Sequence, residues 1–108
     1  MTKFYKYWQN NSGGSFDIDD ASGIGVIVWI EATDDRHADS RAESIGIYFN
    51  GVDDELDCEC CGDRWSEAYL VHERDKPTFD QKYDFVWHDT IYIHYMNGTI
   101  ERVKKEVL

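Results

Sequence analysis

The stretch around which this chain organises its fold is residues 44–65, SIGIYFNGVDDELDCECCGDRW. It holds all three cysteines, Cys58, Cys60 and Cys61, together with three of the eight glycines and a dense run of acids. Gly46 is typical of a helix end, because glycine adopts the left-handed conformation that stops a helix. From Trp65 onward, apolar and polar residues alternate, which is typical of a strand. The stretch therefore predicts a helix before it and a strand after it.

The residues upstream of this stretch predict one helix. Thr33 or Asp34 is a suitable N-cap, because a short polar side chain there accepts a hydrogen bond from the first turn. An apolar stripe at helical spacing follows, made of Ala38, Ala42 and Ile45. Asp35, Asp39 and Glu43, spaced by four, predict an acidic ridge on the outer face of the helix. This ridge is either a solvated face or a surface for a basic partner.

Strand patterns occupy most of the remaining chain. Residues 24–30 are apolar on both faces and predict a central strand. Other strands are expected at residues 4–8, 65–73, 83–87, 91–96 and 99–103, and Asn97-Gly98 joins the last two as a hairpin. We expect an α+β fold with a single curved, mostly antiparallel sheet of about five strands, one helix packed on one face and a C-terminal β-hairpin. At 108 residues, the chain 1–108 is expected to form one domain.

The formal net charge of -11 is concentrated in the middle of the chain. Residues 16–67 carry fifteen acids against three arginines, which gives -12. This balance argues against direct binding to nucleic acid or to an anionic membrane, because phosphate contacts need clustered Lys and Arg. It permits a basic protein partner, a metal ion, or imitation of a nucleic acid. The absence of a long apolar run or a signal-peptide pattern predicts a cytosolic protein.

The cysteines suggest a metal site. Cys58 and Cys61 with the following glycine form C-x-x-C-G, a spacing that lets two thiolates bind one Zn²⁺. A structural zinc site needs four ligands, and Cys60 with His72 or His94 are the candidates for the others. The alternatives are cysteines packed as small apolar groups, a cysteine nucleophile, and a strained disulfide between Cys60 and Cys61.

A second candidate site is the polar loop at residues 10–14, made of Asn10, Asn11, Ser12, Gly13 and Gly14. Its backbone amides could bind an anion, because oriented N–H groups form such sites. The alternative is a glycine-rich connector without a ligand. Arg64 and Trp65 are expected to be binding contacts beside the cysteine loop, because Arg and Trp often carry the energy of protein interfaces.

Four blocks of this sequence resemble a family of small uncharacterised proteins of tailed bacteriophages, known as a domain of unknown function. The blocks are YWQNNSGGSF (residues 7–16), IEA (30–32), AESIGIYFNG (42–51) and DCECCGDRW (57–65). The resemblance implies a phage-encoded protein that acts in the bacterial cytoplasm, and it implies no activity. Its blocks at residues 10–16, 46–51 and 57–65 are candidates for one shared surface.

These observations favour a non-enzymatic accessory protein that binds a host protein factor or a small ligand, with counter-defence as one setting. A nucleic-acid mimic that inhibits a DNA-binding host enzyme is the first alternative. A nucleotide sponge is the second, with Lys3, Lys6 or Arg64 offsetting the charge and an aromatic from Tyr5, Tyr7 or Trp8. A metal-dependent hydrolase is the third. For acid–base catalysis, the most enzyme-like set is His88, Asp89 and His94, and the alternative is histidines on the surface of strands. The aromatic content suits a homodimer, as it also suits many monomers.

Overall fold

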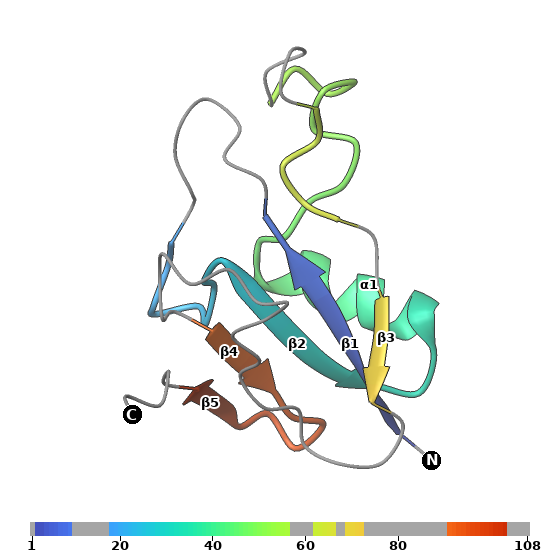
Figure 1. Cartoon of the computed structure of the whole chain (residues 1–108), viewed down its shortest axis with the longest axis vertical. Helices are drawn as coiled ribbons and strands as arrows, with labels where there is room; N and C mark the ends of the chain where they lie inside the picture. The colour runs from blue at the N-terminus through green and yellow to red at the C-terminus, as the bar shows by residue number, and fades with distance from the viewer. Residues whose placement is uncertain (1, 10–17, 57–61, 67–68, 73–90, 104–108) are drawn as a thin grey trace.

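The computed structural model (Figure 1) describes residues 2–9, 18–56, 62–66, 69–72 and 91–103. In chain order the elements are β1 (Lys3–Trp8), β2 (Ile27–Ala32), α1 (Asp35–Ile45), β3 (Tyr69–His72), β4 (Ile91–His94) and β5 (Ile100–Val103). The strands form one open sheet in the order β3-β1-β2-β4-β5. Within these residues, no helix has the length and apolar character needed to cross a bilayer.

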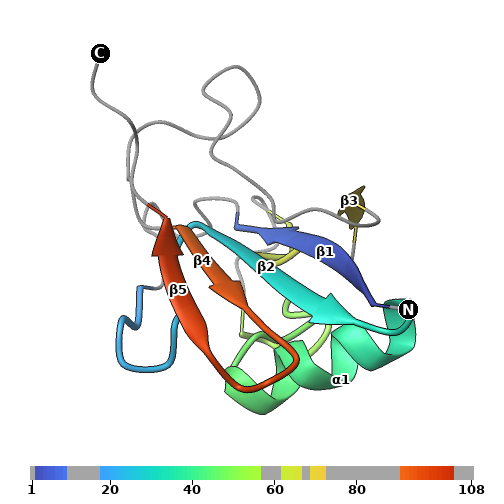
Figure 2. The same ribbon diagram turned by 90° about the horizontal axis from the view of Figure 1, so that it is seen from below.

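The sheet is mostly antiparallel. β1 pairs antiparallel with both β2 and β3, and β4 pairs antiparallel with β5. The exception is β2 with β4, which run parallel, so the chain must cross over between them. α1 lies in this crossover and covers one face of the sheet, as Figure 2 shows. The α+β class, with one helix on a mostly antiparallel sheet, is therefore confirmed for the described residues.

α1 begins and ends where its capping residues require. Asp34 has extended backbone geometry, and its side chain accepts a hydrogen bond of 2.8 Å from the His37 N–H. Gly46 has a φ of 110° and its N–H donates back to the last turn, as a left-handed C-cap does. Between them, Ala38 and Ala42 are fully buried. Because alanine is small, α1 lies close against the sheet.

Two apolar clusters cover the two faces of the sheet. The cluster on the α1 side includes Tyr7, Val28 and Ile30, and the cluster on the opposite face includes Trp29, Ile91 and Ile93. β2 contributes to both clusters, which explains why its sequence is apolar without alternation. β2 lies between β1 and β4, which is the central position that its apolar sequence predicts.

The strand bounds differ from the sequence expectation at several points. β2 starts at Ile27 rather than residue 24, because the chain bends at Val26, although the Gln9 N–H still donates to the Val26 carbonyl. Ile24 packs on the α1 side and Val26 on the other, whereas a regular strand from residue 24 would place both on one face. Of the strand expected at residues 65–73, residues 69–72 form β3 and Trp65 forms an isolated bridge with Gln9, while residues 67, 68 and 73 lie outside the described residues. The expected strand at 83–87 lies outside the described residues.

Residues 95–99 form the turn between β4 and β5. The Tyr95 N–H donates to the Thr99 carbonyl at 2.8 Å, and the Gly98 N–H donates to the Tyr95 carbonyl at 3.0 Å. Gly98 has a φ of 88°, which an L-residue adopts only with strain. The turn is also fixed from outside, because the Met96 N–H donates to a Glu31 carboxylate oxygen at 2.9 Å.

Candidate binding end at the base of two loops

Gln9 and Trp65 bring the bases of two predicted loops together. They form an antiparallel bridge beyond the end of β1. On the two sides of this bridge, the Gln9 N–H donates to the Val26 carbonyl and the Ser66 N–H donates to the Trp8 carbonyl, both at 3.0 Å. Gln9 directly precedes the polar loop, and Trp65 closes the cysteine stretch. The start of the polar loop and the end of the cysteine stretch are distant in sequence and therefore lie next to each other only through the fold.

The side chain of Gln9 is buried and strengthens this junction. Its Nε2 donates to the Gly25 carbonyl at 2.8 Å, which joins the start of the polar loop to the segment after it. Its Oε1 accepts from Arg64 Nη1 at 3.4 Å. Because a buried amide that lost these partners would be costly, the contacts fix the junction. Gln9 lies in the sequence block at residues 7–16, but nothing in that block indicates its partners, which are set by the tertiary fold.

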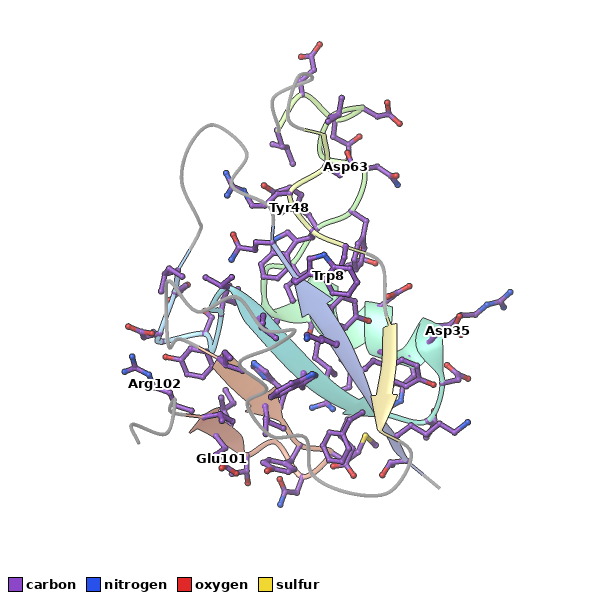
Figure 3. The ribbon with its side chains drawn as sticks, in the orientation of Figure 1. Trp8, Asp35, Tyr48, Asp63, Glu101 and Arg102 are labelled. Atoms are coloured by element: carbon purple, nitrogen blue, oxygen red, sulfur yellow. The ribbon has the colours of Figure 1, made fainter. Side chains whose placement is uncertain are left out.

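Arg64 and Trp65 occupy interior positions in the structure. Both side chains are buried, and Trp65 joins the core cluster on the α1 side with Tyr7 and Ile47. Their position gives these residues a role in holding the two loop bases together. Among the described residues, Trp8 is an exposed aromatic at this end, at 42% exposure, whereas Tyr5 and Tyr7 are buried. In Figure 3, Trp8, Tyr48 and Asp63 lie in the same part of the molecule.

Residues 50–56 form a compact turn that projects from the top of Figure 1. The Leu56 N–H donates to the Gly51 carbonyl at 2.7 Å, and the Val52 N–H donates to an Asp63 carboxylate oxygen at 3.0 Å. Asp63 lies on the segment that leads to Arg64 and Trp65, so the turn is attached to the same junction. The exposed side chains of the turn are mainly acidic: Asp53, Asp54 and Glu55.

The other predicted site residues are placed as follows. The polar loop (Asn10, Asn11, Ser12, Gly13 and Gly14), the cysteines (Cys58, Cys60 and Cys61) and the pair His88 and Asp89 lie outside the described residues. The backbone of His72 pairs with Phe4, five residues from Gln9 along the chain. At about 3.3 Å per residue, this separation is about 16 Å, so the pairing does not bring His72 to the base of the cysteine loop.

His94, the other histidine considered for metal binding, is buried on the α1 side of the sheet. Its Nε2 lies 2.7 Å from the Gly23 carbonyl. Burial lowers the pKa of His94 below its ordinary value of 6.5, which favours the neutral ring, and the nearby Arg41 lowers it further. Among the described residues, no three His, Cys, Asp or Glu side chains are grouped in a way that could hold a metal ion.

The predicted acidic ridge of α1 is interrupted by a contact with the core. Asp35 and Glu43 are exposed, but Asp39 is half-buried and accepts a hydrogen bond of 2.8 Å from the hydroxyl of the fully buried Tyr7. Burial, and then this hydrogen bond, raise the pKa of Tyr7 far above its usual range. Asp39 therefore helps to attach α1 to β1, and the stripe is not a purely solvated face.

The fold and the junction define a small α+β protein with an open sheet, one helix and a loop-bearing end next to β1. The family comparison is consistent with the resemblance seen in the sequence. The chain belongs to the family described as Domain of unknown function (DUF7296), whose model matches residues 2–107. No curated protein and no solved structure matches the chain.

Proposed function

We propose that this chain is a phage-encoded, non-enzymatic accessory protein that binds a host protein factor or a small ligand in the bacterial cytoplasm. Counter-defence is one form that such binding would take. The proposal places the functional surface at the end that carries the polar loop and the cysteine stretch. The phage origin rests on the resemblance of the sequence blocks.

The observation that carries this proposal is the bridge between Gln9 and Trp65. It joins the bases of two segments that the sequence independently marks as unusual, one rich in Asn and Gly and one rich in Cys and acids. Loops that start from a rigid junction are well suited to binding, because the scaffold positions them while their sequences stay variable. The exposed Trp8 beside this junction is of a residue type that often dominates binding energy.

The test is affinity capture from a bacterial lysate, with the tagged chain as bait. The informative variant is Trp8→Ala, and the matched control is Met96→Ala, because both side chains are 42% exposed. Met96 lies at the other end of the sheet from Trp8. Its N–H donates to the Glu31 carboxylate, and Glu31 pairs with Phe4 at the start of β1, whereas Trp8 is at the end of β1. We expect Trp8→Ala to lose the captured factor and Met96→Ala to keep it.

A small-molecule ligand is distinguished from a protein partner by thermal stabilisation. A ligand that binds only the folded chain raises the melting temperature by mass action, whereas a non-binding compound does not. A panel of nucleotides therefore tests the sponge alternative directly. If capture recovers nothing reproducible and the panel gives no shift, the binding role is wrong.

Zinc binding by Cys58, Cys60 and Cys61 is a separate proposal, and it rests on the C-x-x-C-G spacing; the pairing of His72 with Phe4 does not support His72 as the fourth ligand. Native mass spectrometry of protein purified without chelator tests it and also reports whether the chain is a homodimer. One zinc per chain, lost when Cys58 and Cys61 are changed to Ser, would support the site. An unmodified chain mass would leave the cysteines as packing residues.

A further inference from the structure

Leu56 is an apolar side chain held outward on the projecting turn of residues 50–56. It is 63% exposed, more than the four other large exposed apolar residues of the described chain, which are between 40% and 43% exposed. Most apolar side chains of this size are buried when the fold permits, because their exposure to water is unfavourable. The turn lies at the top of the molecule in Figure 1.

The turn presents Leu56 in a defined direction. Three backbone hydrogen bonds close it: Asp54 N–H to the Asn50 carbonyl at 3.1 Å, Glu55 N–H to the Val52 carbonyl at 3.2 Å, and Leu56 N–H to the Gly51 carbonyl at 2.7 Å. Because these bonds close the backbone of residues 50–56 before any partner binds, docking of the turn would require little further ordering of these residues. Preorganisation of this kind favours affinity.

Along the sequence, the charged residues on both sides of Leu56 have one sign. Residues 50–63 include six acids and no Lys or Arg. Asp53, Asp54 and Glu55 are exposed on the turn, and Asp63 is exposed and is connected to the turn through the Val52 N–H. An anionic frame of this kind repels phosphate backbones and anionic membranes, and it favours a surface rich in Lys and Arg.

We propose that the 50–56 turn docks on a basic protein, with Leu56 entering an apolar pocket that Lys and Arg side chains border. This inference rests on the proposed function and names the class of its partner. A second copy of the chain does not fit, because two such turns would repel each other and the whole chain has 22 acids against 11 Lys and Arg. The acids would speed association and set orientation, and Leu56 would supply the buried contact.

The test uses two fractions of a bacterial lysate, the proteins that a cation exchanger retains at neutral pH and those that it does not. Immobilised wild-type chain is compared with Leu56→Thr and with Ile100→Thr, which alters an exposed aliphatic residue (43%) on β5. Glu101, next to Ile100, lies at the opposite end of the molecule from Asp63 in Figure 3. Urea unfolding of each variant checks that the fold is intact.

We expect the captured protein to come from the retained fraction. Its dissociation constant should rise about ten-fold or more for Leu56→Thr and stay within about two-fold for Ile100→Thr. A combined Asp53→Asn, Asp54→Asn and Glu55→Gln variant should bind with a weaker dependence on salt. Capture that is independent of Leu56, or that comes only from the unretained fraction, overturns this inference and leaves the proposed function standing. Absence of capture from both fractions counts against a protein partner altogether.

Discussion

Replacing Gly23 by alanine should destabilise the fold through two separate effects. Gly23 has a φ of +72°, where an L-residue is strained. A Cβ at this position would lie 2.8 Å from both Cε1 and Nε2 of His94 and 2.9 Å from Cγ2 of Ile100. The His94 ring is buried and its Nε2 lies 2.7 Å from the Gly23 carbonyl, so it cannot swing away without losing that contact.

The magnitude follows from adding the two effects. The left-handed conformation costs an alanine about 1–2 kcal/mol. Forcing a methyl group into a filled space costs about 1–3 kcal/mol more. Gly98 is the matched control, because its φ is +88° and nothing lies within 4 Å of an added Cβ. Gly98→Ala should therefore lower the free energy of unfolding only by the cost of the left-handed conformation. The loss for Gly23→Ala should be larger by about 1–3 kcal/mol, because the added methyl group also clashes with its neighbours.

The assay is urea unfolding followed by tryptophan fluorescence, for which the four tryptophans provide the signal. The free energies are compared at equal m-values, so that a change in midpoint reports stability. A His94→Ala change should reduce the additional cost of Gly23→Ala, because it removes the ring that the new methyl group meets. Equal losses for the Gly23→Ala and Gly98→Ala variants would refute the placement of His94 against this turn.

Three further predictions concern the same frame. Tyr7→Phe removes the hydrogen bond to Asp39 and should lower the free energy of unfolding, measured in urea, by about 1.5–3 kcal/mol. The control is Tyr5→Phe on the same face of the sheet, which should cost clearly less because no side-chain hydrogen bond of Tyr5 is seen among the described residues. Burial lowers the pKa of His94 in the folded state, so the unfolded chain binds the proton more readily. The contribution of His94 to the free energy of unfolding should therefore be fully present above pH 6.5 and decrease as the pH falls below that value. A His94→Gln variant should lack that part of the slope in a melting-temperature titration, and an unchanged slope would contradict this assignment. Asp34→Ala removes the cap on the His37 N–H and should cost about 1 kcal/mol in the same unfolding assay, while a loss near zero would mean that the cap does not stabilise α1.

The local patterns of the sequence were sufficient to predict the helix and the class of the fold. Gly46 and the alanine stripe predicted α1 because capping and helical periodicity are local properties. The double-sided apolar run predicted a central β2 for the same reason. The parallel pairing of β2 with β4 had no local signal, because nothing in either strand records the direction of its neighbour.

The candidate site was predicted less completely. The unusual composition of the polar loop and of the cysteine stretch is visible in the sequence, but their shared base depends on Gln9, whose partners Gly25 and Arg64 are 16 and 55 residues away. Arg64 and Trp65 illustrate the same difficulty. Residue type predicted surface contacts, whereas the packing of Trp65 against Tyr7 places it in the core.

The proposed binding surface joins two segments: residues 10–17, which follow Gln9, and residues 50–66, which include Trp65. Amide hydrogen exchange of the chain, alone and with the basic lysate protein that it captures, tests this most directly. We expect slower exchange on binding in both residues 10–17 and residues 50–66, with β4, β5 and α1 unchanged. Protection confined to α1 or to the β4–β5 turn, or to one of the two segments alone, would contradict a single shared surface.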